Sequence, residues 1–199
     1  NDLRPTPVGV VFPEGREPAQ VDGGEAHTCA LMKDGGVMCW GRDNVGQLGN
    51  GDTSDTIHTP SSNVELPEGR AATDLSVGDH HSCALLDNGS ITCWGLNNYG
   101  QLGENTTTNR LIPVYAQLPD SSSAVSVSVG PHSSCAILEN SSLYCWGHNH
   151  FGRLGIGVTG GIYLTPMFVE GPTNIVDLSV NYDHVCGLYE NGSVSCWGR

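Results

Sequence analysis

His81-Ser82-Cys83-Ala84-Leu85-Leu86-Asp87-Asn88-Gly89-Ser90-Ile91-Thr92-Cys93-Trp94-Gly95 is the stretch of this sequence that predicts the fold. Two runs rich in apolar residues flank the turn-forming residues Asp87-Asn88-Gly89, which predicts two antiparallel strands joined as a hairpin. Pairing Cys83 with Cys93 across the hairpin leaves a loop of three residues that ends in glycine. Such a loop is typical of a type I turn followed by a glycine in the left-handed region.

The hairpin recurs along the chain. The tripeptide Cys-Trp-Gly occurs four times, at intervals of 54, 52 and 51 residues, beginning at Cys39, Cys93, Cys145 and Cys196. A series of prolines has three intervals of 53 residues and consists of Pro7, Pro60, Pro113 and Pro166. Two independent markers with nearly the same period indicate one repeating unit. The markers divide the sequence near 7–59, 60–112, 113–165 and 166–199, with residues 1–6 added to the last unit.

Each unit predicts four short strands. In the second unit, the alternating residues Leu75–Gly78 predict the first strand, and the hairpin supplies the second and third. A glycine-rich link, Asn98–Gly103, leads to a fourth strand that contains the periodic proline, and proline in a sheet belongs at an edge. Four-stranded units of this length suggest propeller blades. The expected fold is therefore all-β: a single β-propeller domain over 1–199, with four repeats of a four-stranded antiparallel blade.

The repeat has a recognisable pattern: His, then Cys-Ala-Leu, a polar-Gly turn, Cys-Trp-Gly and Asn-x-x-Gly-Gln-Leu-Gly. This pattern resembles the repeat of the regulator of chromosome condensation family, and it extends over essentially the whole chain. The resemblance implies a β-propeller, commonly of seven blades, that acts through its loops. Family members work in nuclear and in secreted settings, so the fold alone does not select a function. The cysteines of this chain depart from the nuclear members and resemble the secreted branch.

Two ring sizes are compatible with the sequence. It opens with a fourth-strand segment, Thr6–Val11, and closes on a third strand, Cys196–Arg199. Pairing Val8–Val11 with the last hairpin would close a four-bladed ring and remove both free sheet edges. The family resemblance instead implies a seven-bladed ring, of which these four blades are a part. Contact between the two ends favours the closed ring, and a gap between them favours the arc.

The eight cysteines fall into four pairs, each ten residues apart: Cys29/Cys39, Cys83/Cys93, Cys135/Cys145 and Cys186/Cys196. In the hairpin register, each pair lies at a non-hydrogen-bonded position where Cα atoms approach to about 4.5 Å, a separation that a disulfide tolerates. Other connectivities exist, but only hairpin-local pairing repeats identically. Zinc is disfavoured because its ligand pairs are usually closely spaced. Four disulfides indicate an oxidising compartment, so we expect the protein outside the cell or at its surface.

Two further residue types recur within the hairpin. Three histidines each face a glycine across it, in the pairs His27/Gly41, His81/Gly95 and His184/Gly198. We expect them to pack and hydrogen-bond; the alternative, a metal or anion site on the ring axis, is weakened by Ser133 in the third unit. Each tryptophan follows a cysteine and so points to the opposite sheet face: Trp40, Trp94, Trp146 and Trp197. Core between blades is expected for them, with an aromatic ligand platform as the alternative.

Composition and motifs argue against several functions. Acidic residues outnumber basic ones 21 to 8, giving a net charge of −13, which would repel nucleic acid and anionic membranes. No apolar run is long enough to span a bilayer. The sequence contains no nucleophile elbow, phosphate-binding loop or paired zinc-ligand motif, so we expect no catalytic residue, cofactor or metal. Asn50–Asp55 has some features of a calcium loop, but a plain Asx-rich turn is favoured.

These observations predict a non-catalytic extracellular module that binds a protein or acts as a scaffold, including through self-assembly. The loops at Asn50–Thr59, Glu104–Leu111 and Ile156–Leu164 differ between units, and loops are where recognition is individual. Residues expected to contact a partner are Asp52, Asp55, Asn105, Arg110 and Tyr163. The alternative is a lectin-like propeller that binds a glycan; Tyr99 and Phe151 at one repeat position favour it, and Val45 in the first unit weakens it.

Four asparagines are candidate N-glycosylation sites. Asn88, Asn140 and Asn191 lie in acceptor sequences at the expected hairpin tips, and Asn105 lies in one within a loop. The alternative is that Asn-Gly is favoured at these tips simply because it forms turns.

Overall fold

The computed structural model describes residues 6–53, 57, 59–61, 63–120, 122–171 and 173–199. Its strands form four antiparallel sheets, and each sheet is one blade. The first blade contains β1 (Pro18–Gly23), β2 (His27–Met32) and β3 (Val37–Gly41), and the second contains β4 (Ala72–Val77), β5 (His81–Leu86), β6 (Ile91–Gly95) and β7 (Arg110–Tyr115). The third contains β8 (Ala124–Val129), β9 (Ser133–Leu138), β10 (Leu143–His148) and β11 (Ile162–Phe168), and the fourth contains β12 (Ile175–Val180), β13 (His184–Tyr189) and β14 (Val194–Gly198).

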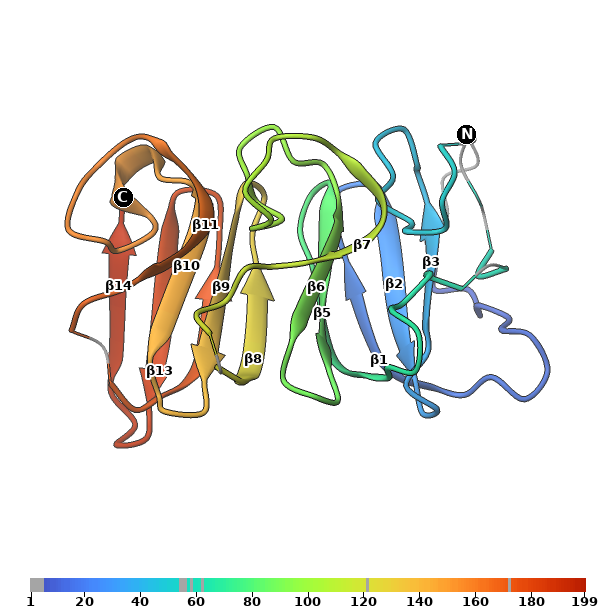
Figure 1. Ribbon diagram of the computed structural model, residues 1–199. Coiled ribbons are helices and arrows are strands. Elements are labelled where there is room, and N and C mark those ends of the chain that lie inside the picture. The colour runs from blue at the N-terminus through green and yellow to red at the C-terminus, as the bar shows by residue number, and fades with distance from the viewer. Residues whose placement is uncertain (1–5, 54–56, 58, 62, 121, 172) are drawn as a thin grey trace.

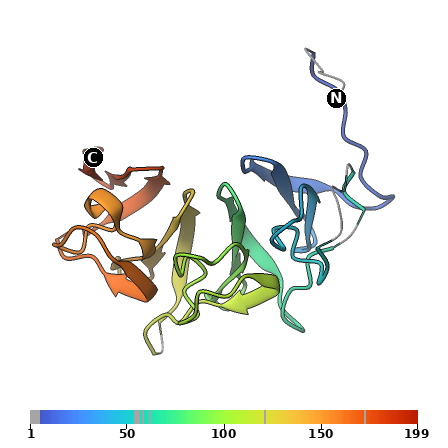
Figure 2. The ribbon, with the colours of Figure 1, turned by 90° about the horizontal axis from the view of Figure 1, so that it is seen from above.

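The blades stand side by side in an arc (Figures 1 and 2). Within the described ranges the one helical element is a short 3-10 turn, η1 (His150–Gly152). None of the described helical structure is long and apolar enough to cross a membrane.

The predicted hairpin register is confirmed. Cys83 pairs with Cys93 in the second blade, and Gly89 at the end of the turn has a φ of 78°. The third hairpin has Ser141 at this position, and Ser141 adopts the same left-handed conformation with a φ of 63°. The strands and the turn length therefore impose the conformation even where glycine is absent.

The prediction of a fourth strand holds in only two of the four units. Pro113 lies in β7 and Pro166 lies in β11. Around Pro60, the described residues form two isolated bridges, Met38 with Asn63 and Gly41 with Ile57, and no strand of greater length. Gly51, Asp52 and Asp55 disfavour a strand before Pro60, whereas the apolar residues Leu111 and Ile112 stand directly before Pro113.

The segment Thr6–Val11 was expected to be a strand, and this prediction is wrong. Residues 6–11 form no strand, and β14 pairs only with β13 among the described strands. Figure 2 shows the N-terminal and C-terminal blades at opposite ends of the arc. Of the two arrangements considered, the described residues therefore form an open arc and not a closed four-bladed ring.

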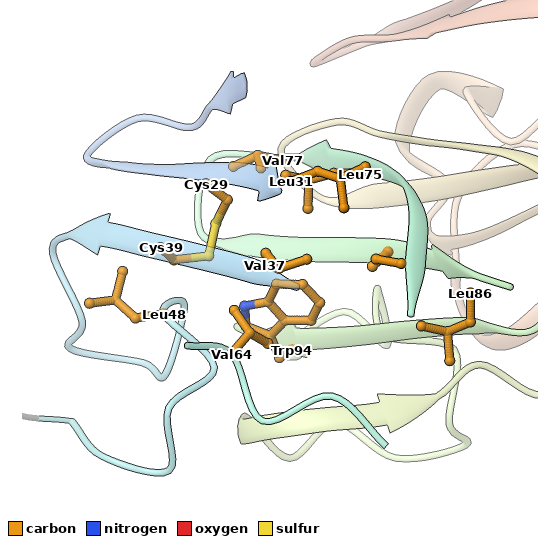
Figure 3. Close-up of a cluster of buried hydrophobic side chains, with 12 residues drawn as sticks. Cys29, Leu31, Val37, Cys39, Leu48, Val64, Leu75, Val77, Leu86 and Trp94 are labelled. Atoms are coloured by element: carbon orange, nitrogen blue, oxygen red, sulfur yellow. A yellow bond between two sulfur atoms is a disulfide. The ribbon is translucent and has the colours of Figure 1, made fainter. Parts of the chain in front are cut away.

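The core lies between neighbouring blades. In the first interface, Trp94 of β6 packs with Leu31, Leu48 and Leu75, and all four side chains are buried (Figure 3). Its indole N–H donates to the Gln47 carbonyl of the preceding blade at 3.0 Å.

Two other tryptophans make the same kind of hydrogen bond to the blade before them. Trp146 donates to the carbonyl of Gln101 at 2.8 Å, and Trp197 donates to that of Arg153 at 3.0 Å. Trp40, in the first blade, instead packs edge-on against Phe12 with ring centroids 5.8 Å apart. The expected role of tryptophan as core between blades is thus met at three interfaces.

Candidate interaction surface

The two edges of the arc differ in what they carry. Each hairpin turns at one edge, which we call the tip face. The opposite edge, which we call the loop face, carries the short turns 24–26, 78–80, 130–132 and 181–183 and the long loops 42–53, 96–109 and 149–161 (Figure 1, upper edge). The loops that differ between repeats therefore gather on one face.

Four of the five residues expected to contact a partner are described, and they lie on or beside this face. Asp52 and Asn105 are exposed, whereas Arg110 forms an ion pair with Glu104 at 2.9 Å. Tyr163 is half-buried and packs against the core between the third and fourth blades. Asp55 lies outside the described residues.

The long loops are tied to the next blade. The backbone N–H of Gly51 donates to the carbonyl of Leu111 at 2.9 Å, and that of Asn105 donates to the carbonyl of Leu164 at 3.0 Å. These two loops therefore also brace an interface, which preorganises the surface that they present.

Each long loop is held from inside by one buried side chain. Asn97 accepts from the backbone N–H of Leu102 at 3.0 Å and donates through Nδ2 to the carbonyl of Thr106 at 3.0 Å. Asn149 does the same, accepting from Leu154 and donating to the carbonyl of Val158, both at 3.0 Å. The side-chain amide thus links the two ends of the loop.

Asp43 occupies this position in the first repeat. Its Oδ1 accepts from the backbone N–H of Leu48 at 3.0 Å, but its Oδ2 is buried without a hydrogen-bond partner among the described residues. Burial, and to a lesser degree the charge of Asp52, raises the pKa of Asp43 to about 6, although the Leu48 hydrogen bond opposes this shift. Our reading of the sequence missed this residue, which an alignment of the repeats would have revealed as an Asn-to-Asp change.

The repeated histidines join blades. Nε2 of His27 lies 2.9 Å from Oγ of Ser82, and Nε2 of His81 lies 3.0 Å from Oγ of Ser134. Because the Ser134 hydroxyl donates its own hydrogen to the Gln101 carbonyl at 2.8 Å, His81 must donate through Nε2. Burial lowers the pKa of His27 to about 4 and that of His81 to about 3. These contacts match the expected packing and hydrogen-bonding role.

The glycine that faces each histidine leaves space for the backbone just before it, whereas the imidazole ring lies against Gly24 in the first blade and Gly78 in the second. Gly95 lies opposite His81 with a φ of 99°, and an added Cβ would lie 2.5 Å from the carbonyl oxygen of His80. The third interface lacks the histidine contact, because Ser133 replaces the histidine and Val185 replaces the serine that would receive it. Both partners of the contact are therefore lost together.

The cysteines pair within their hairpins. All four bridges span ten residues with Cα atoms 4.1 Å apart, and no described cysteine is free. This is the hairpin-local connectivity that the spacing predicts.

The candidate glycosylation sites are all exposed. At the hairpin tips, Oδ1 of Asn88, Asn140 and Asn191 accepts from the backbone N–H two residues later, at 3.1, 3.0 and 2.9 Å. Turn formation therefore accounts for these asparagines by itself, and their glycosylation stays a prediction.

A group of rings on the loop face was not anticipated. Tyr99 from the second blade stacks on His148 of the third, with centroids 4.5 Å apart and planes 11° apart. His132 lies 5.0 Å from Tyr99 and 5.5 Å from Tyr182 of the fourth blade, centroid to centroid. Arg153 lies against Tyr182, with its Cζ 5.8 Å from the ring centroid. We call these five residues the ring cluster.

The sequence carries a signal for the ring cluster in its departures from the repeat. Arg153 stands where the other units have Gln47 and Gln101, and His148 stands where they have Arg42 and Leu96. The ring cluster is therefore particular to the second, third and fourth blades. Among the described residues, the ring cluster included, no group of three or more His, Cys, Asp or Glu side chains is arranged to hold a metal ion.

Comparison with known proteins identifies similar sequences. A family model described as "Regulator of chromosome condensation (RCC1) repeat" matches residues 34–85, 88–137 and 140–188, and a second model of the same description matches 19–47, 72–101 and 124–153. The Ultraviolet-B receptor UVR8 of Arabidopsis thaliana is 31% identical over 154 residues, which cover 77% of this chain and 34% of that protein.

Solved structures resemble the fold. The yeast RCC1 protein (Prp20), in a crystal structure with Kap60, matches with a TM-score of 0.84 and 22% identity over 98% of this chain and 47% of that one. Human WBSCR16 matches with a TM-score of 0.86 and 23% identity over 98% of this chain and 52% of that one. This chain thus spans about a third to a half of the length of these three proteins.

Proposed function

This chain belongs to the regulator of chromosome condensation repeat family, and from that premise we propose that it is a non-catalytic interaction module that presents its loop face to a protein partner outside the cell. The observation that carries the proposal is the contrast between the two faces. The hairpins repeat almost residue for residue, whereas the long loops differ and are held rigid by Asn97 and Asn149. Individual, preorganised loops on a repeated scaffold are suited to recognition.

The relatives support a protein partner. The structure of Prp20 was solved with Kap60 bound, so a propeller of this kind can bind a protein. A glycan partner is less favoured here, because the Tyr99 ring, which would have to serve as a sugar platform, is stacked on His148. The acidic net charge of −13 favours a partner that is basic or neutral overall.

The disulfides support an extracellular location, since four bridges persist in an oxidising compartment and are rare elsewhere. Peptide mapping of the native protein without reduction tests this point. Free thiols in the isolated protein would contradict the location, whereas a link between different hairpins would contradict only the hairpin-local pairing.

Site-specific photo-crosslinking tests the interaction surface. A benzoylphenylalanine placed at Asp52, Asn105 or Val158 on the loop face is expected to form protein adducts in the native medium. The same group at Asn88 or Asn140 on the tip face is the matched control and should form none. Adducts from the tip face alone would contradict the proposal, and binding to a glycan array without protein adducts would decide for a lectin.

A further inference from the structure

Arg153 rebuilds the turn in which it lies. In the first two units the corresponding glutamines cap this turn, with Oε1 of Gln47 accepting from Val45 at 3.0 Å and Oε1 of Gln101 accepting from Tyr99 at 2.9 Å. A guanidinium cannot accept a hydrogen bond. Arg153 instead donates through Nε to the carbonyl of His150 at 3.1 Å. With arginine in place of glutamine, the turn therefore loses this side-chain hydrogen bond and contains a buried cation.

This cation is incompletely paired. The Arg153 side chain is 1% exposed, and its Nη2 reaches one oxygen of Asp183 at 3.5 Å, a long contact. Nη1 is buried and has no partner among the described residues. A buried guanidinium N–H without an acceptor is unfavourable, so the position is suited to receive one.

The rings around Arg153 lack negative charge. Burial first, and then the charge of Arg153, lowers the pKa of both His132 and His148, so both imidazoles are neutral at pH 7. The Nδ1 atoms of these two histidines are also unpartnered. Tyr182 lies over the guanidinium and is 55% exposed, so its ring separates Arg153 from solvent and offers an aromatic surface.

Resting on the proposed function, we propose that the ring cluster binds a protein segment that places a single carboxylate beside an aromatic side chain. The carboxylate accepts hydrogen bonds from Arg153 Nη1 and an imidazole N–H once the Tyr182 ring turns aside. The aromatic side chain stacks on the exposed Tyr182 ring. The remainder of the segment is neutral or basic, because the protein as a whole carries a charge of −13.

Two probe peptides separate this local recognition from general electrostatics. They are acetyl-Lys-Tyr-Asp-Lys-amide and its isostere acetyl-Lys-Tyr-Asn-Lys-amide, titrated at pH 7 while the ring-proton resonances of His132 and His148 are followed by NMR. The acidic protein attracts the more basic Asn peptide at long range, whereas the ring cluster should prefer the Asp peptide by about tenfold, the value of one charge-assisted hydrogen bond.

Arg153→Gln is the decisive variant, because glutamine occupies this position in two other repeats and is compatible with the fold. It should remove the preference for the Asp peptide. Arg70→Gln is the matched control: it removes the same charge from the tip face, where Arg70 pairs with Asp87, and should leave the preference unchanged.

Three results would overturn the inference: equal affinity for the two peptides, an Asp preference that survives Arg153→Gln, or the same resonance shifts from inorganic phosphate alone. None of them bears on the crosslinking experiment, which asks only whether a protein contacts the loop face. A failed peptide titration with intact loop-face adducts would therefore reject the ligand class and leave the proposed function standing.

Discussion

Asp43, Asn97 and Asn149 hold the same position in three successive repeats, and each accepts a backbone hydrogen bond from the residue five positions later. The two asparagines also donate across the loop, which an ionised carboxylate cannot do. A protonated Asp43 could act as such a donor, and its raised pKa of about 6 agrees with that need. Protonated Asp43 therefore stabilises the folded protein fully below pH 4, near the pKa of aspartate in the unfolded chain. This stabilisation is lost as the pH rises through about 6.

We expect Asp43→Asn to raise the free energy of unfolding by about 1–3 kcal/mol at pH 7, because the amide supplies the missing donor without a buried charge. At pH 4.5 the gain should be much smaller. Urea unfolding at the two pH values measures both numbers.

The reverse exchange is the control. Asn97→Asp should destabilise the protein at pH 7 and less so at pH 4.5. If Asp43→Asn gave no gain at either pH, the carboxylate oxygen would have to be satisfied in another way.

At the scale of the elements, the contact from histidine to serine is present at two of the three interfaces between blades. The third interface has Ser133 and Val185 at these positions. Ser133→His together with Val185→Ser should install the missing contact. Each change alone leaves a buried polar group without its partner, so the two should be coupled favourably by about 1 kcal/mol. A double-mutant cycle by urea unfolding measures this energy, and additive effects would show that the contact carries no stability of its own.

The same contacts predict sensitivity to acid. His27 and His81 have pKa values lowered by burial to about 4 and about 3, so the stability that they contribute is present above pH 6.5 and is lost as the pH falls toward those values. At pH 4 each of these histidines should therefore lower the free energy of unfolding by about 3 kcal/mol relative to a side chain that stays neutral.

The comparison that isolates this effect uses glutamine, which can donate to the serine but does not titrate. The double variant with His27→Gln and His81→Gln should lose much less stability between pH 7 and pH 4 than the parent. His184→Gln, at the half-buried equivalent position in the last blade, is the control and should follow the parent. Equal pH slopes for all three proteins would exclude the two histidines as the cause.

How well each element was predicted depends on whether its determinants are local. The hairpins were predicted correctly, because Cys83 and Cys93 fix the register and Asp87–Gly89 fixes the turn. The fourth strand predicted around Pro60 does not form among the described residues, because such a strand depends on pairing with a distant edge and Gly51 and Asp52 disfavour it.

The ring cluster could not be predicted from periodicity. Tyr99, His132 and Tyr182 come from three blades, and only the packing of the blades brings them together. Arg153 and His148 depart from the repeat in the sequence, but such departures do not show which residues lie close together.

At the scale of the whole molecule, each blade touches only its neighbours, so stability should be graded along the arc. All residues of β5 and β6 are buried, whereas β14 is largely exposed. Backbone amides in β5 and β6 should therefore exchange with solvent at least roughly tenfold more slowly than those in β13 and β14. Hydrogen exchange with mass spectrometry of the unreduced protein measures this gradient, and uniform protection from end to end would contradict it.

The indole hydrogen bond gives the row of blades a direction. Trp94, Trp146 and Trp197 each donate to the loop of the blade before. Every junction therefore joins the side of one blade that carries the tryptophan to the side of its neighbour that carries the loop, and these two sides differ. Such head-to-tail contacts admit another copy of the unit at either end without any new kind of junction, and the rotation per step decides between a closed ring and an open helix. Two copies related by a twofold axis would bring like surfaces together, so a symmetric dimer would have to be built from some other part of the protein.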